Sequence, residues 1–328
     1  MTRAFIHAVC AALSGAAMVL PASSLAAEAY PSQPIRMIVG FAAGGPTDII
    51  ARLLAQDMGR TLGQSMVVEN KTGANSLIAT RDVAGAVPDG YTVLFASLSH
   101  NVNHLLLGDQ AGYDPLKDFA PISNAASLPM VAVTAYDSPI RSMKQLIEQA
   151  RAKPDSISYG SAGNGGSAHL AAAMMGTMAN LQMIHVPFRG NGPALTEVMA
   201  GRVSFMFYPI IGVAENVQAK RLRVLALGSP EARADFPGVP AMSDIGFPDF
   251  QDTAPWVGLL APAGVSDAVV QKLNAAMVHA LKQPQVQARL KDLGALPIGD
   301  TPQHFREFLV EDQKRWAAVI KAAGISAQ

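Results

Sequence analysis

Two stretches of this chain repeat one pattern: Met37-Ile-Val-Gly-Phe-Ala-Ala-Gly-Gly-Pro-Thr-Asp48 and Ile157-Ser-Tyr-Gly-Ser-Ala-Gly-Asn-Gly-Gly-Ser-Ala-His169. In each, a short apolar run ends in a turn of small residues, and a helix is expected to begin directly after it. Backbone N–H groups at the start of a helix have no partner inside the helix and bind anions readily. Because the two stretches lie far apart in the sequence, they predict two domains that hold one small anion between them. A protein that captures a solute is therefore favoured over a catalyst.

Strands and helices alternate around the two glycine-rich loops. The apolar runs Met66-Val-Val-Glu and Tyr91-Thr-Val-Leu-Phe-Ala follow the first loop, and helical patterns separate them. This alternation predicts an α/β fold in which each domain is a mostly parallel sheet flanked by helices. We expect domain 1 at residues 28–122 plus 256–328 and domain 2 at residues 123–255, so that two chain crossings form a hinge.

The first 26 residues have the features of a secretory signal peptide. Arg3 is the only charge at the start, residues 6–20 are mostly apolar, and Ser24-Leu25-Ala26 offers small residues at a cleavage site. The apolar run is too short for a membrane span. Cys10 is the single cysteine of the sequence, so the mature chain would carry none. These features predict export to a bacterial periplasm without disulfide bonds.

Composition and motifs argue against several other classes of protein. The sequence contains 25 Lys and Arg against 25 Asp and Glu, which gives no footprint for nucleic acid or anionic lipid. Neither loop matches a nucleotide-binding fingerprint, and no nucleophile elbow is present. His100 and His104 are four residues apart but have no acid or thiol clustered with them, so no metal site is expected. We expect no cofactor and no catalytic residue, although spacing alone leaves a pair of catalytic carboxylates open.

Each glycine-rich loop has a structural interpretation beside the functional one. Gly44-Gly45-Pro46-Thr47-Asp48 forms a good helix start, and capping alone would account for it. Glycines also let a ligand carboxylate approach the backbone closely. The run 160–167 has four glycines, more than a plain turn needs, and its Ser161, Ser167 and Asn164 offer hydrogen-bonding side chains. Ligand contact is favoured there, whereas His169, one turn into the helix, is expected to be a packed residue.

Several motifs occur in one order along nearly the whole mature chain. They are Tyr30-Pro-x-x-Pro-Ile-Arg-x-Ile-Val, Phe41-Ala-Ala-Gly-Gly-x-Thr-Asp48, Val67-Val-Glu-Asn, Pro88-Asp-Gly-Tyr-Thr, Tyr113-Asp-Pro-x-Lys-Asp-Phe-Ala-Pro, Ser161-Ala-Gly-Asn-Gly, His185-Val-Pro-Phe-Arg-Gly, Pro193-Ala-Leu-Thr and Trp256-x-Gly-Leu-Leu-Ala-Pro-Ala-Gly. Together they resemble the Bug/TctC family, the periplasmic solute receptors of tripartite tricarboxylate transporters. The resemblance implies a two-lobed, Venus-flytrap periplasmic binding protein that delivers a small carboxylate to the permease subunits of a membrane transporter. It also implies a protein without catalytic residues, and we expect a monomer.

The resemblance also assigns ligand-binding residues to this sequence. In domain 1 these are Ala43, Gly44, Gly45, Thr47 and Asp48, and in domain 2 they are Ser161, Ala162, Gly163, Asn164 and Gly165. Ser97, His100 and Asn103 correspond to a family loop that borders the cleft, and Phe188 and Arg189 replace a usual Tyr-Lys pair.

Three positions depart from the family pattern. Pro46 replaces a glycine and removes one backbone N–H. Leu77 stands where a cleft Asn is usual, and Tyr208, which we include among the ligand-binding residues, replaces a usual Asp. These changes predict a hydrophobic or aromatic carboxylate rather than an amino acid or a citrate-like ligand. Two alternatives stay open: a periplasmic sensor that presents its ligand to a signalling partner, and a periplasmic hydrolase or isomerase of carboxylates.

Overall fold

Strands from both ends of the chain form one sheet in the computed structural model, which describes residues 30–230, 234–248 and 250–326. The expected signal peptide at 1–26 lies outside these residues. The order across the sheet is β11-β4-β10-β3-β1-β2. The strand bounds are Ile35–Val39 for β1, Met66–Asn70 for β2, Thr92–Ser97 for β3, Phe119–Ser127 for β4, Trp256–Pro262 for β10 and Leu296–Pro297 for β11.

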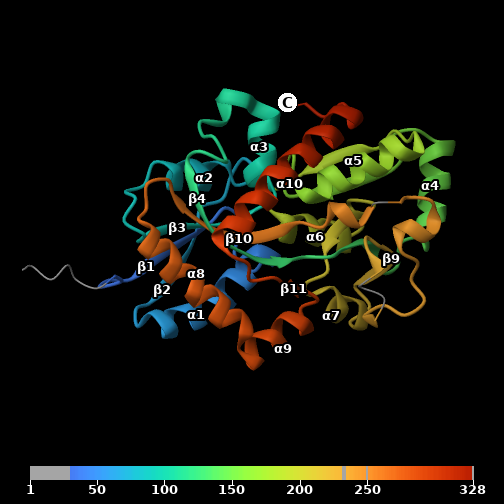
Figure 1. Cartoon of the computed structure of the whole chain (residues 1–328). Helices are drawn as coiled ribbons and strands as arrows, with labels where there is room; N and C mark the ends of the chain where they lie inside the picture. The colour runs from blue at the N-terminus through green and yellow to red at the C-terminus, as the bar shows by residue number, and fades with distance from the viewer. Residues whose placement is uncertain (1–29, 231–233, 249, 327–328) are drawn as a thin grey trace, which may run out of the picture. The chain divides into compact units, whose positions relative to one another are not determined.

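Helices cover both faces of this sheet and complete what we call lobe 1. Helices α1 and α8 lie on one face, and α2, α3 and α10 lie on the other (Figure 1). The bounds are Pro46–Leu62 for α1, Leu77–Ala84 for α2, Ser99–Leu107 for α3, Asp267–Lys282 for α8, Pro284–Asp292 for α9 and Pro302–Ala323 for α10. Coverage on both faces explains why nearly all side chains of the inner strands β3 and β10 are buried, instead of alternating between buried and exposed.

Lobe 2 contains the remaining strands and helices. Strand β5 lies between β8 and β9, β6 pairs with β7, and a bridge between Tyr159 and Phe205 links the two groups of strands. The bounds are Met130–Ala135 for β5, Ser158–Ser161 for β6, Ile184–Pro187 for β7, Met206–Pro209 for β8, Leu222–Leu227 for β9, Met143–Ala152 for α4, Ser167–Ala179 for α5, Asn191–Met199 for α6 and Val213–Gln218 for α7. Lobe 2 has its own hydrophobic core, which includes Phe205 and Phe207.

The strand directions differ in part from the expectation of mostly parallel sheets. β1 is parallel to β2 and β3, and β6 is parallel to β7, as strand-loop-helix units require. However, β10 is antiparallel to both β3 and β4, and β5 is antiparallel to both β8 and β9. Both of these strands begin where the chain enters a lobe from the other one. They do not follow a helical crossover, so nothing forces them to be parallel.

Two chain segments connect the lobes side by side. One joins β4 directly to β5 through Leu128 and Pro129, and the other enters β10 at Trp256. The backbone N–H of Leu128 donates to the carbonyl of Pro255 over 2.8 Å. Strand β4 continues through the expected domain boundary at residue 122 and leaves the lobe 1 sheet only at Ser127.

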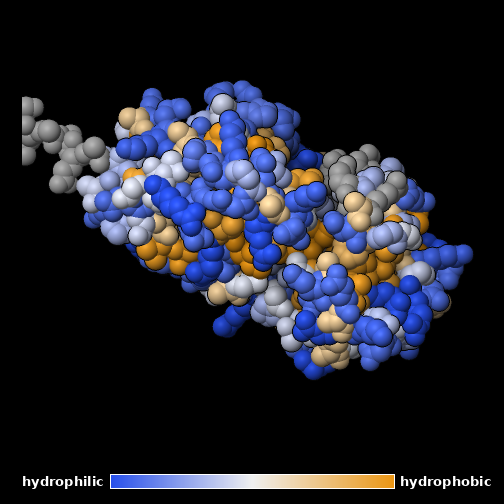
Figure 2. Space-filling model, turned by 90° about the horizontal axis from the view of Figure 1, so that it is seen from below, coloured by the Kyte–Doolittle hydropathy of each residue, from blue (hydrophilic) through white to orange (hydrophobic). Residues whose placement is uncertain are grey.

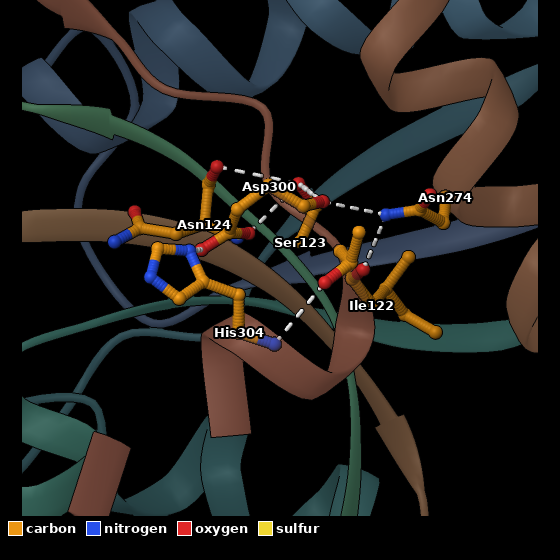
Figure 3. A network of polar contacts seen from close by, with 7 residues as sticks. Ile122, Ser123, Asn124, Asn274, Asp300 and His304 are labelled. Carbon is orange, nitrogen blue, oxygen red and sulfur yellow. Dashed lines mark hydrogen bonds and ion pairs between the residues drawn. The ribbon is translucent and has the colours of Figure 1, made fainter. Parts of the chain in front are cut away.

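A polar network fastens the segment before α10 to the connecting strand β4 (Figure 3). The carboxylate Oδ1 of Asp300 accepts the backbone N–H of Asn124 at 2.7 Å, and the hydroxyl of Ser123 donates to the backbone carbonyl of Asp300 at 2.9 Å. The side chain of Asn274 on α8 bridges the carbonyls of Ile122 and Asp300, both at 2.8 Å. These bonds hold α8, α10 and β4 together next to the hinge.

The long helix α10 contacts both lobes. Its buried side chains include Trp316 and Ile320, which pack with Leu98 and Val102 of lobe 1 and with Leu170 of α5 in lobe 2. Figure 1 shows α10 running alongside α5 toward the C-terminal end of the chain. Figure 2 shows, on the face that it presents, hydrophilic side chains interspersed with hydrophobic ones. Within the described residues, no helix combines the length and the apolar character that a membrane crossing requires.

Candidate functional site

The starts of helices from both lobes meet at one small cavity of about 30 Å³. Thr47 at the start of α1 and Ser99 at the start of α3 line it from lobe 1, and Ser167 of α5 and Asn191 of α6 line it from lobe 2. Each of these helices has at least two full turns, so its first N–H groups carry the positive end of a helix dipole. An anion here gains about 0.3–1 kcal/mol from each helix end.

The rest of this small cavity is uncharged and combines polar groups with apolar side chains. The hydroxyl oxygens of Ser97 and Ser99 lie 3.2 Å apart, and the connecting segments contribute Leu128 and Pro255. No Asp, Glu, Lys or Arg occurs among the described residues that line it. The cavity therefore lies at the hinge between the lobes, and backbone dipoles and hydroxyl groups, not cations, would balance the charge of an anion.

A larger cavity of about 350 Å³ adjoins the small one. Phe41, Asn75 and Ala162 line both. Its other lining residues are largely apolar: Leu77 from α2, Leu106 and Leu107 from α3, and Pro187 and Phe188 from lobe 2. Arg189 is the one charged side chain among the described residues that line it. The two cavities together offer a polar end for an acid group and an apolar space for the body of a ligand.

A strained turn forms the part of the wall that faces lobe 2. Ala74, Asn75 and Ser76 have φ values of 45°, 52° and 71°, three consecutive residues in the left-handed region. The side chain of Asn103 donates to the backbone carbonyl of Asn75 at 2.9 Å and accepts from its side-chain nitrogen at 3.3 Å. The turn packs against Gly40, where any larger residue would clash, because a Cβ there would lie 1.8 Å from the hydroxyl oxygen of Ser76. Such strain is characteristic of functional sites, where surrounding contacts maintain it.

Asp48 shapes the first loop from behind and does not line any of the cavities described. Its carboxylate accepts the backbone N–H of Gly44 at 2.9 Å, the Arg52 guanidinium at 2.9 Å and the Asn70 amide at 2.8 Å. Burial acts to raise the pKa of Asp48, but the hydrogen bonds from these three groups outweigh it and lower the pKa. Asp48 is therefore a carboxylate that fixes the loop conformation.

His100 and Tyr208 are packed inside the two lobes. His100 is 1% exposed, stacks on Tyr113, meets the edge of Phe119 and holds the carbonyl of Pro115 at 2.9 Å through Nε2. Burial lowers the pKa of His100 to about 4, so the ring is neutral at pH 7. Tyr208 is 4% exposed and belongs to the core of lobe 2. The structure thus places both side chains away from the cavities.

The structure brings about half of the expected ligand-binding residues to these cavities. Ala162, Gly163, Asn164, Phe188 and Arg189 line the larger cavity, Thr47, Ser97 and Ala162 line the smaller one, and Gly45 and Thr47 line a neighbouring cavity of about 10 Å³. The others line none of these three cavities: Ala43, Gly44, Asp48, His100, Ser161, Gly165 and Tyr208.

Other lining residues had no assignment from the sequence. Leu106 and Leu107 lie on the same face of α3 as Ser99 and as Asn103, which the family resemblance had already placed at the border of the cleft. His100 points elsewhere, and the sequence did not predict this helix. Asn191 is the first residue of α6. The sequence Gly190-Asn191-Gly192-Pro193 is typical of the start of a helix and could have indicated Asn191 as a lining residue.

The Ser161 hydroxyl does not form an accessible nucleophile. Its oxygen lies 2.6 Å from Nε2 of His185, a separation typical of a serine paired with a base. However, Ser161 is completely buried, and its oxygen also accepts the backbone N–H of Gly163 at 3.1 Å. The pair therefore has a structural role in this conformation.

Two lobes that enclose an anion-sized cavity at their hinge define a solute-binding protein. Residues 50–325 match the family described as the tripartite tricarboxylate transporter family receptor, TctC. A protein from the tcbD-tcbE intergenic region of Pseudomonas sp. strain P51 is 36% identical over 94% of this chain and 92% of its own length. BugT of Bordetella pertussis is 33% identical over 92% and 93%. The chain belongs to the TctC family of receptors.

Solved structures agree with this assignment. The periplasmic binding protein BugD is 32% identical with a TM-score of 0.86, and the match covers 91% of this chain and all of that one. An R. palustris protein with adipate is 30% identical, with a TM-score of 0.86 over 90% and 99% of the two chains. MatC from Rhodopseudomonas palustris with bound malate is 31% identical, with a TM-score of 0.83 over 89% and 100%. The fold is the two-lobed α/β fold of periplasmic binding proteins, and the function of the family is solute binding and not catalysis.

Proposed function

We propose that this protein captures one small carboxylate between its lobes and delivers it to the permease of a tripartite transporter. The observation that carries this proposal is the convergence of the starts of α1, α3, α5 and α6 on one small polar cavity. Relatives of the same fold hold adipate and malate. The site of action would be the periplasm, and the active form a monomer.

The ligand we propose has an apolar body. Its carboxylate would occupy the cavity of about 30 Å³, and its body would lie against Leu77, Leu106 and Leu107 in the adjoining cavity of about 350 Å³. Apolar contact stabilises such a body by about 25 cal/mol per Å² buried, whereas a buried polar group without a partner destabilises the complex. Arg189 would face a second acidic group if the ligand carries one.

Isothermal titration calorimetry of the purified mature chain with adipate, benzoate, malate, citrate and glutamate tests this proposal. We expect one binding site, with adipate or benzoate bound more tightly than malate, citrate and glutamate. Mass spectrometry of the recovered compound should show it unchanged. Absence of binding to every member of the panel, or chemical conversion of one of them, would contradict the proposal.

A matched pair of variants tests the location of the carboxylate. Thr47→Ala and Ser167→Ala each remove a hydroxyl group that lines the small cavity, one from each lobe. Each should weaken binding by about one to two decades, because a hydrogen bond to a charged group contributes about 1.5–3 kcal/mol. Thr196→Ala, on the exposed side of α6, removes a hydroxyl that bonds only within its helix and should leave affinity unchanged.

A further inference from the structure

Two histidine rings lie together beneath the second glycine-rich loop. His169 is the third residue of α5 and His185 belongs to β7, and their rings are parallel to within 2° with centroids 4.0 Å apart. The phenol ring of Tyr159 on β6 stacks on His185 at 5.0 Å. Neither histidine lines the small or the larger cavity. The two rings can therefore affect the cavities only indirectly, through the glycine-rich loop that they contact.

The first ring holds the backbone of Gly165. The Gly165 N–H donates to Nδ1 of His169 over 3.0 Å. An imidazole nitrogen accepts a hydrogen bond only when it carries no proton, so the proton of this ring must be on Nε2. Gly165 has a φ of +72°, a left-handed conformation that glycine adopts without strain, and the hydrogen bond to His169 fixes it there.

The second ring holds Gly163 through a serine. Nε2 of His185 lies 2.6 Å from the hydroxyl oxygen of Ser161, and that oxygen accepts the N–H of Gly163 at 3.1 Å. Gly163 has a φ of +125° and lines the larger cavity. The pair of rings thus fixes both left-handed glycines of the loop, one directly and one through a hydroxyl group.

The surroundings keep both rings uncharged. Among the described residues, the titratable groups in ring contact with these histidines are each other and the phenol of Tyr159. Burial lowers the pKa of His169 to about 4, and burial together with the neighbouring His169 lowers the pKa of His185 to about 3. Two neutral imidazoles can stack at this distance, whereas two imidazolium ions would repel each other.

We propose that His169 and His185 are positioning residues of the ligand loop 161–166, which hold the backbone at Gly163 and Gly165 in place before a ligand arrives. This inference rests on the proposed function, because the loop is a ligand loop only if the cleft binds an anion. In this role, Nδ1 of His169 must accept the hydrogen bond from the Gly165 N–H. An apolar residue of similar size at position 169 could fill the space but could not accept this bond.

Nuclear magnetic resonance on the ligand-free protein tests the role without any ligand. The ¹⁵N shifts of His169 at pH 7 should show Nδ1 without a proton, and the Gly165 amide should be protected from hydrogen exchange. In His169→Leu this protection should fall by about tenfold or more, the effect of one lost hydrogen bond. In His169→Asn, whose side-chain oxygen can take the place of Nδ1, protection should persist.

Calorimetric titration with adipate provides the second readout. His169→Leu should bind adipate at least about tenfold more weakly than the wild type, and His169→Asn should recover most of that loss. His279→Asn, which alters an exposed histidine on α8, is the control and should bind normally.

Three results would overturn the inference: a proton on Nδ1 of His169 in the wild type, normal Gly165 protection in folded His169→Leu, or equal losses in the Asn and Leu variants. If the wild type does not bind adipate, the proposed function fails for this ligand. The hydrogen-exchange data, which need no ligand, still show whether His169 positions the loop.

Discussion

Leu128 and Pro255, which lie on the two segments that connect the lobes, are joined by a backbone hydrogen bond of 2.8 Å. Because both segments also line the small cavity, rotation about them changes the distance between the helix starts of lobe 1 and those of lobe 2. A ligand that contacts helix starts in both lobes binds fully only when the lobes approach. The hinge and the binding site are therefore one structural unit.

Gly165 is the position at which a small substitution should oppose the contact between the lobes. A Cβ on Gly165 would lie 2.6 Å from a methyl carbon of Leu106 and 2.8 Å from one of Val102, both on α3 of lobe 1. We expect Gly165→Ala to bind adipate at least about tenfold more weakly. Small-angle scattering in saturating adipate should give it a larger radius of gyration than the wild type.

Gly201→Ala is the matched control, because Gly201 has a similar φ of +70° but a Cβ there would meet no atom within 4 Å. It should show the loss of stability that a strained residue produces, with unchanged adipate affinity. If both variants bind adipate as the wild type does, the contact between the lobes at Gly165 has no part in binding.

Leu77 should determine selectivity. It is buried and lines the larger cavity, so Leu77→Asn replaces apolar wall by an amide. Affinity for benzoate should fall about fivefold, which corresponds to about 40 Å² of lost apolar contact, while affinity for malate should fall less or rise. Competition titrations measure the ratio. The control is Ile78→Asn, which changes a neighbouring apolar side chain that is 52% exposed and should leave the ratio of benzoate to malate affinity unchanged. If both variants show the same ratio, Leu77 does not determine selectivity.

The sequence predicted the framework well because strands and helices with strong apolar periodicity follow local rules. The runs Met66-Val-Val-Glu and Tyr91-Thr-Val-Leu-Phe-Ala lie in β2 and, from Thr92 on, in β3, where the pattern predicted strands. Helix α3, Ser99–Leu107, did not emerge from the sequence, because its polar residues Asn101 and Asn103 are buried by partners distant in the sequence. One such partner is Asp312, which accepts the amide of Asn101 at 2.9 Å.

The candidate site was harder to predict than the fold. A glycine-rich loop identifies a region, but the direction of each side chain depends on tertiary contacts. His100 and Ser99 are adjacent in sequence, yet Ser99 lines the small cavity and His100 stacks on Tyr113. Residues 74–76 all adopt left-handed conformations, although only Asn75 has a local preference for that region.

Asp300 should contribute strongly to stability through its network on β4. Asp300→Ala removes the acceptor of the Asn124 backbone N–H and leaves that group without this partner. An unsatisfied buried donor costs about 1–3 kcal/mol. Urea unfolding should show this decrease, whereas Asp137→Ala, which changes an exposed acid, should change the free energy of unfolding by less than about 0.5 kcal/mol. Equal stability of the two variants would contradict the importance of the network in Figure 3.

Three histidines with lowered pKa values should make the protein less stable in mild acid. His100, His169 and His185 have pKa values of about 4, 4 and 3 in the folded protein, against 6.5 for an ordinary histidine. The unfolded chain therefore binds more protons below pH 6.5, and the free energy of unfolding falls as the pH decreases from 6.5 toward 4. For fully buried His100 alone, the loss at pH 5 is about 2 kcal/mol. Urea midpoints at pH 7.5 and pH 5 measure it, and equal stability at both would show that these rings are not held neutral.

The crystal structure of the mature protein grown with adipate tests the central claim most directly. We predict one adipate carboxylate in the small cavity, within hydrogen-bond distance of groups at the starts of helices from both lobes, including Thr47 and Ser167, with the chain of the ligand along Leu77 and Leu106. A carboxylate bound to one lobe only, or held by Arg189 with the small cavity occupied by water, would contradict the account.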